Sequence, residues 1–85
     1  MSYRVGDRII MVDAPPDDRA LANGDYGRIS IMFDDGDICV KFKRVWNIDD
    51  NPKMEWIVQS DEIMKCRKGM TWEQIRLVAD IIREV

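Results

Sequence analysis

Two short runs of alternating apolar residues flank an Asp-Gly turn, and few folds accommodate this arrangement. Residues 28–33 and 38–43 each place an apolar side chain at every second position. A period of two is typical of a strand with one buried face. Residues 34–37 read Asp-Asp-Gly-Asp, and Asp-Gly between such runs favours a tight hairpin because both turn positions tolerate a positive φ. We therefore expect an antiparallel hairpin that buries Ile29, Ile31, Phe33, Ile38, Val40 and Phe42 and turns Cys39, Lys41 and Lys43 outward.

Three further strands and one helix are expected around this hairpin. The β-branched run 7–12 stops at two prolines, and residues 54–58 form another strand-like run. A single helical turn at 60–63 leads into a short strand at 64–67. Residues 71–74 read Thr-Trp-Glu-Gln, which is the pattern of a capping box, so a helix should cover 71–85.

The size and composition of the chain indicate one globular domain, residues 1–85. Apolar residues make up 46% and charged residues 34% of the 85, which is ordinary for a folded protein. The sequence contains no apolar run long enough to span a bilayer and no signal-peptide pattern, so we expect a cytoplasmic protein without a membrane partner. Two distant cysteines and no histidine give no zinc-ligand spacing.

Two glycine-containing stretches carry a resemblance to a known family. Val5-Gly6-Asp7-Arg8-Ile9 and Gly24-Asp25-Tyr26-Gly27-Arg28-Ile29 resemble the KOW-type pattern of SH3-like small β-barrels. An Asn-Gly-Asp-x-Gly stretch is also similar to SH3-like insertions of some DNA helicases. The resemblance covers residues 4–67 and implies a mainly β fold, a five-stranded SH3-like barrel, to which the C-terminal α-helix is added.

In such barrels the second strand bends at its start. Glycine there permits a positive φ or a bulge that a side chain would oppose. We therefore interpret Gly24 and Gly27 as architectural residues, with Gly27 at a positive-φ or bulged position.

Charge is distributed in blocks along the chain, whose net charge is -3. Residues 1–37 hold four arginines against eight aspartates, whereas 41–44 and 65–68 are basic. Nucleic-acid-binding relatives of the family carry basic and aromatic residues on exposed strands and loops, and the acidic first loop departs from that pattern. The candidate binding face on strands two and three consists of Tyr26, Arg28, Lys41, Lys43, Arg44 and Trp46. The alternative is that the cations are solvated strand-face groups and that the two aromatic rings cover the barrel ends.

No catalytic, cofactor or metal site is expected. The chain lacks histidine, a glycine-rich phosphate loop and a nucleophile elbow. The aspartates at 34–37 do not have the spacing of a calcium loop, and turn chemistry accounts for them.

The helix carries more apolar surface than one packing face needs. Ile75, Val78, Ile82 and Val85 form one stripe, and Leu77 and Ile81 lie beside it around the axis. We expect Leu77 and Ile81 to be partly exposed and to contact a partner or a second copy in a homodimer. The alternative is a helix that is sunk deeply enough to bury both stripes.

These observations predict a non-enzymatic, protein-binding adaptor or accessory factor of bacterial or phage type. The alternative is a nucleic-acid-binding accessory protein that uses Arg28, Lys41, Lys43 and Arg44. Binding to DNA or RNA that weakens steeply as salt is raised would favour the alternative. The sequence does not identify the partner.

Overall fold

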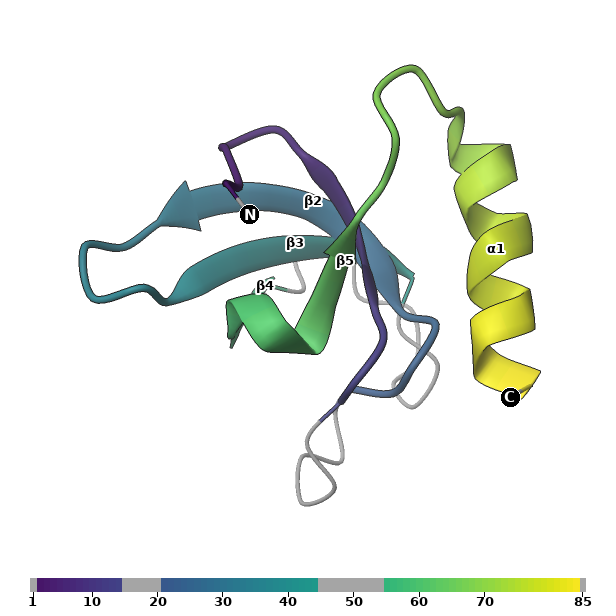
Figure 1. The fold of residues 1–85 in the computed structure, drawn as a ribbon, viewed down its shortest axis with the longest axis horizontal. Coiled ribbons are helices and arrows are strands. Elements are labelled where there is room, and N and C mark those ends of the chain that lie inside the picture. Colours follow the sequence, from purple (N-terminus) through teal and green to yellow (C-terminus); the bar gives the residue numbers. More distant parts are fainter. Residues whose placement is uncertain (1, 15–20, 45–54, 85) are drawn as a thin grey trace.

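The computed structural model describes residues 2–14, 21–44 and 55–84 (Figure 1). In these residues the chain forms five strands, one short 3-10 helix and one α-helix. The elements are β1 (Arg8–Met11), β2 (Tyr26–Met32), β3 (Ile38–Arg44), β4 (Glu55–Val58), η1 (Ser60–Glu62), β5 (Ile63–Lys65) and α1 (Trp72–Glu84). The predicted mainly β class, with five strands and a C-terminal helix, is confirmed.

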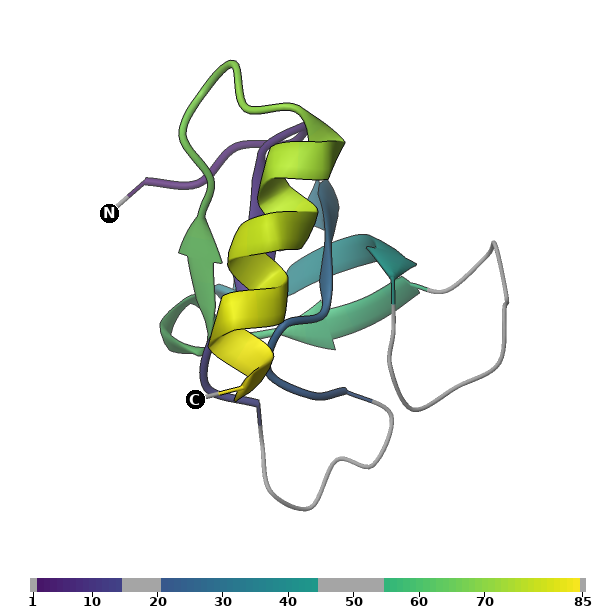
Figure 2. The ribbon, with the colours of Figure 1, turned by 90° about the vertical axis from the view of Figure 1, so that its right-hand side faces the viewer.

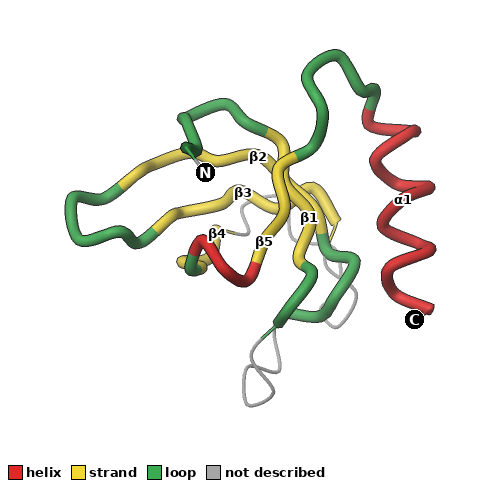
Figure 3. The backbone as a smooth tube through the Cα atoms, viewed as in Figure 1, coloured by secondary structure: helices red, strands yellow, loops and turns green. Residues whose placement is uncertain are grey.

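All five strands belong to one antiparallel sheet (Figure 3). The order is β4-β3-β2-β1-β5, with the predicted β2–β3 hairpin near the middle. β4 and β5 are the two edges, and the sheet is not closed into a barrel within the part of the chain that is described.

The two faces of the sheet cover separate cores. Ile9 and Ile10 are neighbours on β1 and point to opposite faces, because successive side chains of a strand alternate. The inner core contains Ile9, Met11, Leu21, Ile29, Ile38, Val40, Phe42, Val58 and Ile63. The outer core lies between the sheet and α1 and contains Ile10, Tyr26, Cys66, Ile75 and Ala79. Figures 1 and 2 show α1 running alongside the sheet on this second face.

The start of α1 is fixed by the predicted capping box. The Gln74 backbone N–H donates to Thr71 Oγ1 at 3.2 Å, and the Thr71 backbone N–H donates to Gln74 Oε1 at 2.9 Å. These two bonds satisfy groups that the helix cannot pair internally. Thr71 therefore determines where the helix begins and how Trp72, its first residue, is placed.

The prediction that Ile31 and Phe33 point inward is wrong, because a bulge in β2 reverses their direction. Ile29 pairs with Val40, but Ile31 pairs with Cys39, so β2 holds one extra residue between them. An extra residue reverses the face to which the following side chains point. Ile31 is consequently 45% exposed and Phe33 41% exposed.

The entry to β2 depends on two glycines, as predicted. Gly24 has φ of +94°, a conformation that residues with a side chain rarely adopt. Gly27 does not have a positive φ, and the register shift between Tyr26 and Gly27 places the extra residue, Lys43, on the opposite strand β3 and not on β2. A Cβ on Gly27 would lie 2.3 Å from the Lys41 carbonyl oxygen, so β3 approaches too closely for any side chain.

Candidate binding surface

Trp72 gathers three cations from three different strands. Its ring stacks on Tyr26, with 5.9 Å between centroids and 30° between planes. The Arg8 guanidinium lies 4.5 Å from the ring centroid, Lys43 Nζ lies 5.1 Å from it and the Arg28 guanidinium 5.8 Å. Each distance is within the range of a cation–π contact. Docking of α1 therefore builds a cluster that β1, β2 and β3 would not form alone.

The pairing of the strands places a further cation, Lys41, beside this cluster. Arg8 pairs with Arg28 on β2, and Arg28 pairs with Lys41 on β3. Directly opposed like charges on neighbouring strands repel each other. We call Arg8, Arg28, Lys41 and Lys43 the cationic row.

A groove opens beside the cationic row, where β1 and β5 stop pairing. The Cys66 backbone N–H donates to the Arg8 carbonyl at 2.8 Å, and around this point residues 2–8 and 65–72 form the two walls. The groove has a volume of about 860 Å³. Its basic lining residues are Arg4, Arg8, Lys65, Arg67 and Lys68. We call it the basic groove; it shares Arg8 with the cationic row.

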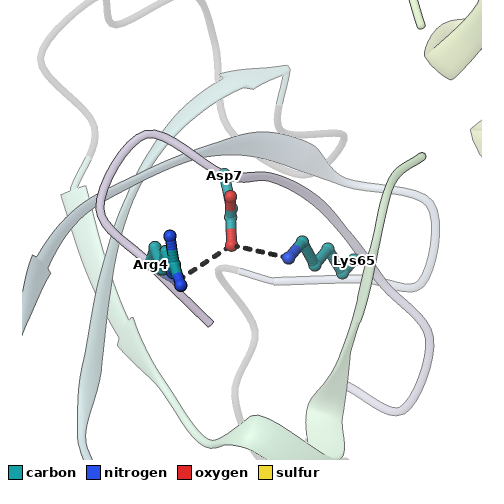
Figure 4. A network of polar contacts seen from close by, with 3 residues as sticks. All are labelled: Arg4, Asp7 and Lys65. Carbon is teal, nitrogen blue, oxygen red and sulfur yellow. Dashed lines mark hydrogen bonds and ion pairs between the residues drawn. The ribbon is translucent and has the colours of Figure 1, made fainter. Parts of the chain in front are cut away.

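Asp7 is the acidic residue of the groove lining, and it already has two partners (Figure 4). The Arg4 backbone N–H donates to Asp7 Oδ2 at 2.8 Å, and Lys65 Nζ lies 3.4 Å from the same oxygen. Asp7 offsets one of the five positive charges. The basic groove therefore has a net charge of +4.

The two cysteines are buried and unpaired. Burial raises the pKa of the Cys66 thiol to about 11, against the smaller opposing effect of the positive Arg8. Cys66 lines the groove but remains a neutral thiol near pH 7 and is a poor nucleophile. The Cys39 thiol donates to Glu55 Oε2 at 3.4 Å.

An apolar row lies across the outer face of β2, β3 and β4. It consists of Ile31, Cys39 and Ile57, which are paired in register. Ile31 is 45% exposed and Ile57 55%, whereas Cys39 between them is only 7% exposed. Cys39 points to the opposite face from the inner-core residues of β3, as predicted, but neighbouring side chains cover it. Ile57 was not singled out from the sequence, because its face depends on how β4 pairs with β3.

The outer surface of α1 is a second exposed apolar site. Leu77 is 60% and Ile81 64% exposed, whereas Ile75 and Ala79 are buried against the sheet. The expected exposure of Leu77 and Ile81 is confirmed, and the alternative of a deeply sunk helix is wrong. Val85, which was assigned to the buried stripe, lies outside the described residues.

The predicted basic and aromatic face is assembled only in part. Arg28, Lys41 and Lys43 are exposed, and two of these three reach Trp72. Tyr26, which was assigned to the candidate face, is 5% exposed because α1 covers it, so its ring offers no open surface there. Arg44 ends β3, and Trp46 lies outside the described residues.

Trp72 itself was missed as a site residue. The sequence marked it only as the start of the helix, and its ring meets the cations through tertiary packing that local patterns do not encode.

Within residues 2–14, 21–44 and 55–84, no group of three or more Cys, Asp or Glu side chains could hold a metal ion. Over the same residues, α1 is too short and too polar to cross a bilayer. Comparison with protein-family models, with curated proteins and with solved structures gives no significant match. The function is therefore inferred from the surface itself.

Proposed function

We propose that this protein is a non-enzymatic, protein-binding adaptor or accessory factor. The observation that carries the proposal is the exposure of aliphatic side chains at Ile31, Ile57, Leu77 and Ile81. An aliphatic side chain left in water forgoes about 1.5–3 kcal/mol of burial. A chain of 85 residues has a small core and little stability in reserve. Covering these residues with a protein partner would recover that free energy.

The charges beside the apolar row indicate what kind of protein surface fits. Cys39 of the apolar row and Lys41 of the cationic row lie on the same face of β3, two residues apart. A partner that places aliphatic side chains on the apolar row and carboxylates on the cationic row would match both. The partner is therefore expected to be acidic and partly apolar at the contact.

Nucleic-acid binding is the second candidate, and the cationic row around Trp72 supports it. Two observations favour protein over nucleic acid. The whole chain carries a net charge of -3, which repels phosphates at longer range. Exposed aliphatic side chains are typical of protein interfaces and contribute little to contacts with a phosphate backbone.

The proposal includes the finer assignment of the fold and the compartment. An SH3-like arrangement is supported by the element order, in which a tight β2–β3 hairpin and a 3-10 turn precede β5. A cytoplasmic location is supported by two cysteines that are both free. A bacterial or phage origin is proposed from the acidic loops, the surplus apolar surface of the helix and the small size of the domain together.

Self-association through α1 is part of the same proposal. Two copies could pack Leu77 and Ile81 against each other in a symmetric contact. Sedimentation velocity should then show a dimer that becomes a monomer in the Leu77→Glu, Ile81→Glu variant.

Affinity recovery from lysate, with and without nuclease, tests the proposed function. A protein partner should be recovered under both conditions and lost in the Leu77→Glu, Ile81→Glu variant. Arg76→Glu is the matched control, because it changes the net charge by the same -2 at an exposed position of α1. The melting temperature of each variant should stay within a few degrees of the wild type. Recovery only without nuclease would favour nucleic acid. Unfolding of the double variant would show that the two residues stabilise the fold itself, which would contradict an interface role.

A further inference from the structure

We propose that the basic groove binds an extended, carboxylate-rich segment of the protein partner. This inference rests on the proposed function, and it names both the chemistry of the partner and the place where it docks. Three features of the groove carry it: concentrated charge, a carboxylate already held in place, and apolar positions between the cations.

The positive charge of the molecule is concentrated around the groove. The basic groove and the cationic row contain eight cations, which are Arg4, Arg8, Arg28, Lys41, Lys43, Lys65, Arg67 and Lys68. With Asp7 they carry +7, which leaves -10 for the rest of a chain whose net charge is -3. Screening limits such a field to about 8–10 Å at physiological salt, so it acts on a ligand that lies in the groove. Within the cationic row, Lys41 lies opposite Glu55 of β4.

The groove already holds one carboxylate between its walls. Asp7 receives a backbone N–H from Arg4 and the ammonium group of Lys65. The side chains of Arg4, Arg67 and Lys68 are exposed and have no acidic partner among the described residues. Carboxylates of a bound segment would give these three cations the type of partner that Lys65 already has.

Apolar groups lie between the charges of the groove. Val5 is 62% exposed, and Met70 and Trp72 line the same space. The volume of about 860 Å³ is within the range of sites that hold small ligands. A segment that mixes carboxylates with aliphatic side chains would therefore match the lining better than a purely charged one.

The aromatic contacts favour a peptide over single-stranded nucleic acid. Sites for single strands offer free aromatic faces on which bases stack. The Trp72 ring is already in contact with Tyr26 and with three cations, and Val5 offers no π surface. A carboxylate-rich peptide needs no stacking surface.

Fluorescence anisotropy with three labelled probes tests the proposal on the full chain. The probes are a peptide of six Glu and two Leu, the same peptide with Gln for Glu, and a single-stranded dT oligonucleotide of twelve nucleotides. The Glu peptide should bind at least about tenfold more tightly than the Gln peptide, and its affinity should fall as salt is raised. Equal binding of both peptides, or tighter binding of the oligonucleotide, would overturn the proposal.

Charge variants separate the groove from the general charge of the surface. Arg67→Gln with Lys68→Gln should weaken binding of the Glu peptide about tenfold, whereas Arg76→Glu, with the same change of -2, should weaken it less than about twofold. An equal effect in both variants would refute the groove as the site. Recovery of the natural partner gives the final distinction. If the groove variant retains the partner, the groove inference fails and the proposed function stands; if the wild type recovers no protein, the proposed function fails.

Discussion

Gly27→Ala should strongly destabilise the pairing of β2 with β3. The added Cβ would lie 2.3 Å from the Lys41 carbonyl oxygen and 2.6 Å from the Phe42 Cα. Both atoms belong to the backbone of β3, so no side-chain rotation can relieve the contact. β2 must move away from β3 by about 1 Å to reach ordinary van der Waals separation.

The expected cost follows from what that movement breaks. Two pairs meet at this point of the hairpin, Tyr26 with Arg44 and Gly27 with Phe42. Loss of about two backbone hydrogen bonds costs roughly 2 kcal/mol. Looser packing of Phe42, which is 4% exposed, adds about 1 kcal/mol. The total of about 3 kcal/mol is large beside a global stability of about 4–13 kcal/mol for a chain of this length.

Urea denaturation and thermal melting measure this cost. A loss of about 3 kcal/mol should lower the melting temperature by roughly 12–24 °C. Gly36→Ala is the control, because Gly36 has φ of +95° but no atom within 4 Å of the added Cβ. It should cost only about 1–2 kcal/mol through backbone conformation. If Gly27→Ala is no less stable than Gly36→Ala, the steric argument is wrong.

Two further changes test the helix start and the buried thiol. Thr71→Ala should lower the free energy of unfolding by about 1 kcal/mol, since it removes the oxygen that accepts the Gln74 N–H; an unchanged urea midpoint would contradict this role. The folded Cys66 thiol keeps its proton up to about pH 11, whereas an unfolded thiol loses it near its ordinary value of 9.0. The wild type should therefore lose stability relative to Cys66→Ala by about 1.4 kcal/mol per pH unit between pH 9 and 11, and parallel pH curves would refute the raised pKa.

Features encoded by neighbouring residues were predictable from the sequence. The β2–β3 hairpin follows from its Asp-Gly turn, and the start of α1 follows from Thr71 and Gln74. Each signal lies within a few residues of the structure it specifies. The exposure of Leu77 and Ile81 was also predictable, because helical periodicity alone separates them from the buried stripe.

Features that depend on tertiary contacts were not predictable in the same way. A single extra residue in β2 turned Ile31 outward, and no local pattern marks that bulge. Tyr26 was assigned to the candidate binding face but lies under α1, an element that begins 46 positions later in the chain. The basic groove joins residues 2–8 to residues 65–72, and the sequence showed these only as separate basic blocks.

Because α1 carries Trp72, docking of the helix and binding of a ligand at the Trp72 cluster are thermodynamically coupled. Ile75 and Ala79 are the buried residues of the helix, while Trp72, Val78 and Ile82 are only partly buried. α1 should therefore undock at a lower free energy than the sheet needs to unfold. Undocking would carry Trp72 away and leave Arg8, Arg28 and Lys43 without the ring that holds them together. By linkage, a ligand that requires this cluster must slow hydrogen exchange of the α1 amides in proportion to its occupancy. The exchange rate of one helix would then report occupancy of a surface that lies mostly on the strands.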